Sequence, residues 1–416
     1  MSFVDSTQQR KDMSSINGAL TGIRVLDFSM VGAGPTCGML LGDMGAEVTK
    51  IEAPGGDVGR KLGPPWQGGE SVVSMSFNRN KRSLVVDLKQ PDGVAIVCRM
   101  AAQADVVLES FRPGVMQKLG LGYVTLAARF PRLVYCSVSA YGQSGPWRDK
   151  PGVDGIVQAV SGLMSQVGTP GAPPMKVQIP AADVVTGFLA TTAVLAALRV
   201  RDQPGPSQGR GQHLDMSLYN GALMLQQSAI ASYLSSGELP LKSGSAAPYS
   251  APNEAYPTQD GWIMIAAYHD DRWKAFCTVI GDPMLSTQPE FASSPLRVAN
   301  REALTRAVSL RLAHKTSAEW QVLLEAADII CGPIADYDAL MAQPQLAHNG
   351  AIVEMQHPRA GTVRMPGSAI GDRDAQARVH LPPPMVGQHS RAVLADFGCT
   401  DSEIDAWLAA RTVIQN

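Results

Sequence analysis

Asp183 lies where a polar, proline-containing segment changes to a long run of small and apolar residues. Pro180 precedes it, the run extends from Val184 to Leu198, and Arg199 and Arg201 follow. A proline suits the first turn of a helix, where its missing N–H would be unpaired anyway, and cations suit the last turn. The pattern therefore predicts a mostly buried helix that begins within a residue or two of Asp183.

The carboxylate of Asp183 has two possible roles at the start of such a helix. Aspartate is among the residues preferred at the N-cap, so the stretch by itself favours a capping role. A carboxylate held at this position can instead act as a nucleophile. In either role the positive end of the helix dipole favours the anion, so we expect Asp183 to be ionised at neutral pH.

Length and composition limit the class of protein and its partners. The 416 residues, 45% of them hydrophobic, exceed one comfortable core, which predicts two domains. The 35 Lys and Arg nearly balance the 37 Asp and Glu, so no overall field attracts nucleic acid or an anionic membrane. The longest apolar run, around Phe188 to Leu198, is too short to span a bilayer.

The termini and the cysteines point to a reducing compartment. The six cysteines are scattered without a CxxC pair, which predicts free thiols and neither a zinc site nor a disulfide framework. Met1–Asn17 is polar and has no apolar signal core. We therefore expect a flexible N-terminal tail and a cytoplasmic protein.

Strands and helices alternate along the first two hundred residues. The expected strands are Ile23–Phe28, Glu47–Glu52, Ser83–Leu88, Ala104–Glu109, Leu133–Val138 and His213–Met216, and the helices between them include Thr36–Met44 and Pro91–Gln103. This order predicts a doubly wound α/β domain, in which ligands bind beyond the C-terminal ends of the strands. A helical pattern at Leu218–Leu234 follows. A strand at Trp262–Ala267 and helices at Asp271–Ile280, Arg301–Ala313 and Ser317–Ala326 then predict a smaller α+β domain.

A glycine-rich turn, Val31–Pro35, follows the first expected strand. It suggests the phosphate-binding turn of a nicotinamide-dependent oxidoreductase, and Glu52 ends the second strand as that class requires. Pro35 interrupts the GxGxxG spacing, however. A structural tight turn is therefore the better interpretation.

Eight segments, in order along the chain, carry a resemblance to a known family. They are Leu20–Phe28 with Ala33–Pro35, Leu41–Glu52, Asn78–Lys89, Tyr141–Pro146, Gln158–Met164, Ala181–Gly187, Gly209–Leu218 and Pro382–His389. Through them the chain resembles the family III CoA-transferases of the CaiB/BaiF type, which include formyl-CoA transferase and carnitine CoA-transferase. The resemblance extends from Leu20 to about Gly398.

The resemblance implies an α/β fold with a Rossmann-like large domain built from both chain ends, a smaller α+β domain, and an interlocked homodimer. The expected division is a tail at 1–17, the first part of the large domain at 18–225, the small domain with its linkers at 226–330, and a return segment at 331–416. The resemblance also implies that Asp183, in the pattern ADxxxG, is the nucleophile. It thereby favours the catalytic role of this carboxylate over the capping role.

The implied reaction moves CoA from an acyl-CoA to a free carboxylic acid. Attack by Asp183 gives a mixed anhydride and CoA thiolate, and the thiolate then gives an aspartyl-CoA thioester that the acceptor acid resolves. CoA is substrate and product, and we expect no tightly bound cofactor and no metal. Turns such as Gly142–Gly145 could supply N–H donors to the oxyanions. Stretches around Arg60, Pro64–Pro65 and His348–Gly350 resemble relatives that act on dicarboxylic acids.

The resemblance places eight residues against CoA. They are Val31, Gly32, Ala33, Val86, Phe111, Lys118, Ser139 and Tyr141. In this assignment Lys118 binds a phosphate, and Phe111 or Tyr141 packs on the adenine or the pantetheine.

The chain departs from formyl-CoA transferase at three positions near CoA. That enzyme has a glutamine at the position of Gly32, an arginine at that of Ala53 and a lysine at that of Ser139. Phosphate binding must therefore shift in part, and the candidates for it are Arg79, Arg82 and Arg60.

An isomerase of the α-methylacyl-CoA racemase type, on the same fold, is the nearest alternative. Such relatives carry a histidine directly before an aspartate in the segment after YGQxGP, whereas this chain has Val153 before Asp154. Valine cannot carry a proton, so two-base racemisation lacks one base. We expect Asp154, displaced by one residue, to point away from Asp183.

Overall fold

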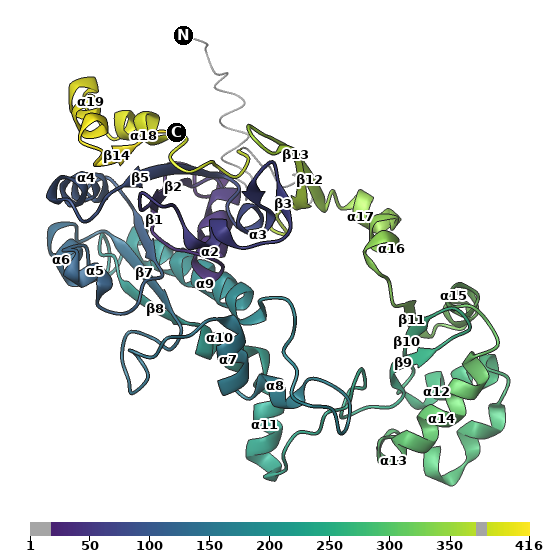
Figure 1. The fold of residues 1–416 in the computed structure, drawn as a ribbon. Coiled ribbons are helices and arrows are strands. Elements are labelled where there is room, and N and C mark those ends of the chain that lie inside the picture. The colour runs from purple at the N-terminus through teal and green to yellow at the C-terminus, as the bar shows by residue number, and fades with distance from the viewer. Residues whose placement is uncertain (1–17, 372–380) are drawn as a thin grey trace. The chain divides into compact units, whose positions relative to one another are not determined.

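The computed structural model describes residues 18–371 and 381–416, so the expected tail at 1–17 lies outside the described residues. The chain forms two compact units (Figure 1). Unit 1 combines the chain up to Leu163 with Lys176–Ala231 and Ala347–Asn416, and unit 2 combines Met164–Met175 with Ser232–Leu346. Unit 1 is thus drawn from both ends of the chain. All six cysteines are free thiols.

Unit 1 is built on a seven-stranded sheet in the order β14-β5-β2-β1-β6-β7-β8 (Figure 1). The strands are β1 (Arg24–Asp27), β2 (Glu47–Glu52), β5 (Lys81–Val86), β6 (Val106–Glu109), β7 (Val134–Ser139), β8 (His213–Ser217) and β14 (Val413–Ile414). Six strands are parallel, and β14 pairs antiparallel with β5 at one edge. The strands predicted for this sheet are confirmed to within two residues at each end.

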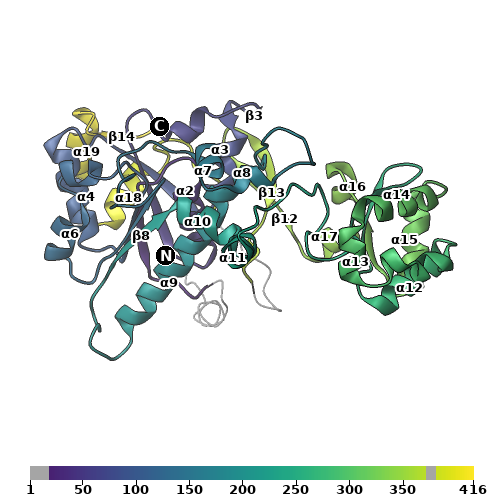
Figure 2. The same cartoon turned by 90° about the horizontal axis from the view of Figure 1, so that it is seen from below.

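Helices cover both faces of this sheet (Figure 2). Val25, Val106 and Leu108 point to one face and pack in a core with the helices α2 (Ala33–Asp43) and α9 (Ala181–Asp202). Leu26 and Val107, one residue out of step, point to the other face and pack in a second core with α4 (Pro91–Ala101) and α18 (Ser390–Asp396). The alternation follows from the two-residue period of a strand, and it explains why consecutive residues such as Val25 and Leu26 are both apolar.

Two short helices, α10 and α11, stand where the sequence predicted a single helix. The helical pattern at Leu218–Leu234 is interrupted at Gln226, which separates α10 from α11. The helices of unit 1 are α2 (Ala33–Asp43), α3 (Val72–Ser76), α4 (Pro91–Ala101), α5 (Val115–Lys118), α6 (Tyr123–Arg129), α7 (Asp154–Val160), α9 (Ala181–Asp202), α10 (Leu218–Leu225), α18 (Ser390–Asp396) and α19 (Asp401–Ala409), with the 3-10 turn η2 (Val58–Lys61). Two more helices, α8 (Leu163–Gln166) and α11 (Gln227–Ser236), contain residues of both units.

Helix α9 begins two residues before Asp183 and carries Arg199 and Arg201 in its last turn, as predicted. Among the described residues it is the one helix long and apolar enough to cross a membrane by length and composition alone. Ala190 and Val194 of this helix are fully buried in the core that contains α2 and the sheet. We therefore assign α9 to the core of unit 1.

The sheet has a topological switch point between β1 and β6. From β1 the chain continues to β2 and β5 on one side, while β6, β7 and β8 follow on the other. The loops after β1 and β6 meet there, where the N–H of Met30 donates to Oγ of Ser110 at 2.9 Å. In open α/β sheets this crevice, beyond the carboxyl ends of the strands, is the usual place for a ligand.

The C-terminal segment returns to complete unit 1. Gly387 and His389 donate their N–H groups to Oγ and O of Ser83 in β5, at 2.8 and 3.0 Å. The hairpin β3–β4 (Trp66–Gln67 and Glu70–Ser71) bonds to the hairpin β12–β13 (Ile352–His357 and Gly361–Pro366). The Pro382–His389 segment and the hairpin near residue 360 therefore fasten the chain end to the N-terminal half of the sheet.

Unit 2 is a small α+β unit with a three-stranded antiparallel sheet in the order β11-β10-β9. Trp273, Phe276 and Leu304 lie in its separate core. Its elements are β9 (Asn253–Pro257), β10 (Trp262–Ala266), α12 (Asp270–Val279), η3 (Pro283–Thr287), η4 (Pro289–Phe291), α13 (Ser294–Ala299), α14 (Arg301–Leu312), α15 (Ser317–Ala326), β11 (Ile330–Pro333) and α16 (Tyr337–Met341), followed by α17 (Pro344–His348). The strand and helices predicted in this part of the chain are confirmed.

Candidate active site

Asp183 is the third residue of α9 and does not cap it. The N-cap residue of α9 is Pro180, and its side chain cannot accept a capping hydrogen bond from the first N–H groups of the helix. The capping role that the sequence stretch favoured is therefore wrong. The side chain of Asp183 is instead partly buried and free of the capping bond, as a reacting carboxylate must be.

The protonation state of Asp183 also differs from the expectation. Burial, and next to it the negative charge of Asp154, raise the pKa of Asp183 to about 7. The expectation that this carboxylate is fully ionised at neutral pH is therefore wrong. The helix dipole is outweighed because the carboxylate is desolvated and a second carboxylate lies at the same helix end.

That second carboxylate is Asp154, the first residue of α7. Its Oδ1 accepts the N–H groups of Ala182 and Asp183, at 2.8 and 3.3 Å. The expectation that Asp154 points away from Asp183 is therefore wrong. Val153 before it is exposed and serves as the N-cap residue of α7, so no proton-carrying side chain stands at that position.

The N-terminus of α2 lies directly against Asp183. A Cβ added at Gly32, the N-cap residue of α2, would lie 2.6 Å from Oδ2 of Asp183. Within residues 18–371 and 381–416, the N–H groups of Gly32, Ala33 and Gly34 have no hydrogen-bond acceptor. Free N–H groups at the positive end of a helix stabilise an anion. This end of α2 can therefore hold an oxyanion formed at the Asp183 carboxylate or at a bound substrate.

A glycine lets α9 approach this end of α2. A Cβ at Gly187 would lie 2.6 Å from Cβ of Thr36 and 2.8 Å from the carbonyl oxygen of Ala33. Residues four apart share one face of a helix, so Gly187 lies on the face of α9 that carries Asp183. The close approach gives the glycine of the ADxxxG pattern a physical purpose, which is to bring the carboxylate to the first turn of α2.

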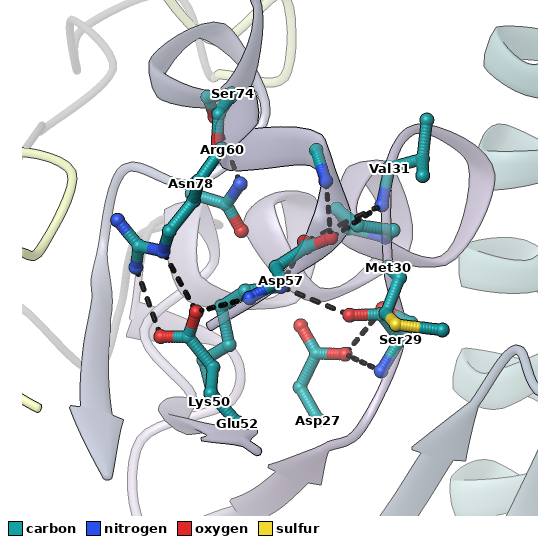
Figure 3. A network of polar contacts seen from close by, with 12 residues as sticks. Asp27, Ser29, Met30, Val31, Lys50, Glu52, Asp57, Arg60, Ser74 and Asn78 are labelled. Carbon is teal, nitrogen blue, oxygen red and sulfur yellow. Dashed lines mark hydrogen bonds and ion pairs between the residues drawn. The ribbon is translucent and has the colours of Figure 1, made fainter. Parts of the chain in front are cut away.

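A buried network of charges supports the backbone that leads to Gly32 (Figure 3). Asp57 lies at its centre, with Oδ2 2.8 Å from Nζ of Lys50, and both side chains are almost fully buried. Lys50 also donates to the carbonyl oxygen of Ser29 at 2.9 Å. Figure 3 shows the other side of Asp57 facing the N–H of Val31, at 3.2 and 3.3 Å from its two oxygens. The network therefore fixes the loop on both sides of Met30.

Val31 itself has a strained backbone, with φ of 68°. A β-branched residue in this left-handed region costs about 1–3 kcal/mol and persists only where its surroundings enforce it. The hydrogen bonds that the N–H of Val31 donates to Asp57 supply that constraint. The strained residue directly precedes Gly32, so the strain lies next to the free N–H groups at the start of α2.

Two further carboxylates of the network are compensated by cations. Burial acts to raise the pKa of Glu52, but its hydrogen bonds and ion pair with Arg60 lower it to about 2. Lys81 donates to Asp27 at 2.9 Å and to the carbonyl oxygen of Pro35 in α2 at 2.8 Å. The network thereby ties β1, β2 and β5 to the start of α2.

The arginines considered for CoA phosphates are engaged elsewhere. Arg60 donates to both oxygens of Glu52, at 2.7 and 2.9 Å, and Arg79 to both oxygens of Asp43, at 3.0 and 2.6 Å. Arg82 pairs with Asp396. These pairings weigh against the expected shift of phosphate binding to Arg60, Arg79 or Arg82.

The eight residues assigned to CoA fall into separate groups. Val31, Gly32 and Ala33 lie beside Asp183, as described above. Phe111, Ser139 and Tyr141 lie at or just beyond the carboxyl ends of β6 and β7, the ligand edge of the sheet. Lys118 is exposed at the end of α5. The side chain of Val86 is fully buried in the core at the end of β5, so only its backbone can meet a ligand.

The Gly142–Gly145 turn is less suited than α2 to hold an oxyanion. The N–H of Gly142 donates to Oγ of Ser139 at 3.0 Å, and the N–H of Gln143 donates to Asp215 at 2.9 Å. Two of its N–H groups are therefore already bonded.

Sequence reasoning missed the parts played by Asp154, Asp57 and Gly187. The signals were present but ambiguous: an aspartate after the YGQSGP segment, an aspartate in the PGGD turn, and the glycine that ends ADVVTG. Each acts through a partner distant in sequence, 29 positions away for Asp154 and 26 for Asp57.

Comparisons with known proteins identify relatives that match most of this chain. The family model described as CoA-transferase family III matches residues 20–390. The human protein named succinyl-CoA:glutarate CoA-transferase is 34% identical over 409 residues, which cover 98% of this chain and 92% of that protein. Acetyl-CoA:oxalate CoA-transferase of Acetobacter aceti is 36% identical over 355 residues, covering 85% of this chain and 89% of that protein. A solved structure of a CaiB/BaiF family protein from Brucella suis has a TM-score of 0.82 at 32% identity, covering 92% of this chain and 100% of that chain.

Proposed function

Because the chain belongs to CoA-transferase family III, we propose that it moves CoA from an acyl-CoA thioester to a free dicarboxylic acid, with Asp183 as the nucleophile. The observation that carries the proposal is the position of Asp183, uncapped and partly buried against the N-terminus of α2. The names of the relatives support the substrate class, since glutarate and oxalate are both dicarboxylic acids.

The reaction proceeds through two kinds of covalent intermediate on Asp183. Its carboxylate attacks the thioester carbonyl, the C–S bond breaks, and CoA thiolate leaves a mixed anhydride behind. The thiolate attacks the aspartyl carbonyl, the anhydride C–O bond breaks, and the donor acid leaves an aspartyl-CoA thioester. The acceptor carboxylate then repeats the two steps in reverse order, so the acceptor leaves as its CoA thioester and Asp183 is regenerated. Covalent catalysis divides one difficult exchange into easier steps, and no net proton is consumed.

Each step passes through a tetrahedral oxyanion that needs donors fixed in advance. Gly32, Ala33 and Gly34 at the start of α2 supply such N–H groups beside Asp183. The Lys50–Asp57 pair holds the loop before them, so these donors need no rearrangement when charge develops.

We also propose an interlocked homodimer whose Rossmann-like large domain is built from both chain ends. Support comes from unit 1, which contains both ends of the chain. Further support comes from exposed apolar side chains on the helices that carry the site, Val153, Ile156 and Val160 on α7 and Phe188 on α9. Linked subunits cannot separate without unfolding, so dilution in the analytical ultracentrifuge should preserve the dimer. A folded monomer on dilution would contradict this arrangement.

The function is tested with a panel of donors and acceptors. Succinyl-CoA and acetyl-CoA are each incubated with glutarate, oxalate or acetate, and the new CoA thioesters are identified by mass spectrometry. We expect transfer to dicarboxylic acids, and hydroxylamine trapping in the presence of donor alone should modify the peptide that contains Asp183. Asp183→Ala should abolish both signals while retaining the native circular dichroism spectrum. Substantial transfer by that variant would overturn the assignment of the nucleophile.

A further inference from the structure

The N-terminus of helix α9 is capped by a side chain from another helix. Pro180 stands at its N-cap position without a capping side chain. Asp154, on α7, takes over this function by accepting the N–H groups of Ala182 and Asp183. One of the two capped groups is thus the N–H of the nucleophile itself, so the position of Asp183 depends on a carboxylate from a different helix.

Asp154 is in turn held by Gln158, one helical turn further along α7. Nε2 of Gln158 donates to Oδ2 of Asp154 at 2.6 Å. Gln158 is fully buried, and its Oε1 accepts the N–H of Val177 at 2.9 Å. Both oxygens of Asp154 are therefore bonded, and the pair also secures the chain that leads into α9.

The charge of Asp154 acts on the same atoms that create the helix field. The free N–H groups of a helix N-terminus carry its positive end and would stabilise the anion of Asp183. A negative charge bonded to two of those groups offsets this stabilisation. Asp154 is also the one charged residue of α7.

Among the described residues, Asp154 is the one charge that shifts the pKa of Asp183. On α2 the titratable groups are Cys37 and, at the last residue of the helix, Asp43, which pairs with Arg79. On α10 the titratable group is Tyr219, and β7 and β8 present Tyr135, Cys136, His213 and Asp215. Arg199, Arg201 and Asp202 lie at the opposite end of α9.

We propose that Asp154 is a positioning residue for the reaction proposed above, which fixes the backbone of the nucleophile and opposes the helix dipole that acts on its carboxylate. Burial, and after it the charge of Asp154, raise the pKa of Asp183, in agreement with this role. A more basic carboxylate is the better nucleophile toward a thioester.

The same property affects how the two mixed anhydrides break down. In the anhydride formed with the donor, attack of CoA thiolate on the aspartyl carbonyl expels the donor acid, and an ordinary carboxylic acid has a pKa of about 4.3. Attack on the donor carbonyl would expel Asp183, with a pKa of about 7. The less basic carboxylate is the better leaving group, so this anhydride favours the aspartyl-CoA thioester. In the second half of the reaction Asp183 must itself leave, so there the same property opposes release of the acceptor thioester.

The test compares two variants that differ only in the charge at position 154. Asp154→Asn alone would set its amide nitrogen against the amide nitrogen of Gln158, so both variants carry Gln158→Met. Gln158→Met keeps the aspartate, and the double variant D154N/Q158M keeps an oxygen for the two N–H groups but removes the charge. Asp336→Asn is a matched control, because Asp336 caps α16 in unit 2 through the N–H of Ala339.

Two measurements are made on these variants. The acid limb of kcat/KM should move to lower pH by about one unit in D154N/Q158M relative to Gln158→Met, and kcat should fall about tenfold, with KM for the acyl-CoA unchanged. Carbon-13 NMR of aspartate-labelled enzyme, with the Asp183 signal assigned by its loss in Asp183→Asn, should show the same displacement. The control should show neither change.

The NMR titration needs no turnover, so it separates this proposal from the proposed function. An Asp183 signal that titrates at the same pH in both Gln158 variants would overturn the role of Asp154, even in an active enzyme. A displaced signal in a protein that transfers no CoA would support the role of Asp154 and overturn the proposed function. Retention of wild-type kcat by Asp154→Ala, with a native circular dichroism spectrum, would also overturn the positioning role.

Discussion

Two groups of carboxylates, one buried and one partly buried, flank the loop from Val31 to Ala33, and they have opposite electrostatics. On one side Asp57 and Glu52 are matched by Lys50 and Arg60. On the other side Asp154 and Asp183 share one helix end, and among the described residues no cation offsets the effect of burial and of Asp154 on the pKa of Asp183. The pKa of Glu52 falls to about 2, whereas that of Asp183 rises to about 7.

The difference between the two groups is whether a cation is paired with the carboxylate, and it distinguishes carboxylates that stabilise the fold from carboxylates suited to a reaction. A buried carboxylate with a cation is locked in its charged form and can organise a backbone, as Asp57 does for Val31. A buried carboxylate without a paired cation destabilises the folded protein when it is charged, and such carboxylates are common in active sites. We therefore expect substitutions in the two groups to have opposite effects on stability.

The largest effect should follow from breaking the compensated group. Lys50→Met leaves Asp57 buried beside Asp27 without its cation. Removal of one partner from a buried pair costs about 3–5 kcal/mol, so the free energy of unfolding measured in urea should fall by about that amount. Activity should fall as well, since Asp57 also restrains Val31.

An exposed lysine on the same segment provides the control for this substitution. Lys61 is the last residue of η2, and its side chain is exposed. Lys61→Met should therefore change the free energy of unfolding by less than about 0.5 kcal/mol. A loss below about 1 kcal/mol in Lys50→Met would show that the network is not the support of the loop.

The opposite effect is expected from the uncompensated group. Asp183→Asn removes a carboxylate whose pKa is raised from 3.8 to about 7. Between these values the folded protein binds the proton more tightly than the unfolded chain, so the wild type loses stability as the pH rises from 4 to 7. Each pKa unit is worth about 1.4 kcal/mol, and partial solvent exposure reduces the total, so the variant should gain about 2 kcal/mol.

The gain should depend on pH in a defined direction. It should be fully present above pH 7, where wild-type Asp183 is charged, and should disappear below pH 4, where both states are protonated. Thermal unfolding of both proteins at pH 4, 6 and 8 measures it. A constant difference across this range would show that Asp183 titrates normally.

The sequence allowed prediction of the elements of this region but not of its electrostatics. Strands such as Val106–Glu109 follow from local apolar runs, and the start of α9 follows from Pro180 and the terminal arginines. The resemblance to a family identified Asp183 and the Val31–Ala33 loop as site residues. The state of Asp183 was predicted wrongly, because only the helix dipole is visible in sequence.

What escaped prediction depends on contacts between distant segments. Asp154 reaches α9 from α7, and nothing in the residues around Val153 shows which N–H groups its carboxylate meets. Arg79 seemed available for phosphate because its bidentate partner, Asp43, lies 36 positions earlier in the chain. Pairings of this kind are set by how the elements pack, and a local pattern does not encode them.

The smallest expected effect concerns Gly32, which lies between the two groups of carboxylates. Its substitution tests how the two groups are connected. A Cβ there would meet Oδ2 of Asp183 at 2.6 Å, so Gly32→Ala must displace this carboxylate, while the backbone φ of −126° is open to alanine. Because the carboxylate is the mobile end of a side chain, the fold should persist, and kcat should fall about tenfold, equivalent to about 1.4 kcal/mol. Gly55→Ala is the matched control, since an added Cβ at Gly55 has no neighbour within 4 Å. If Gly32→Ala instead destabilised the protein as much as Lys50→Met while leaving kcat unchanged, the loop would belong to the structural group alone, and the contact with Asp183 would carry no part of the chemistry.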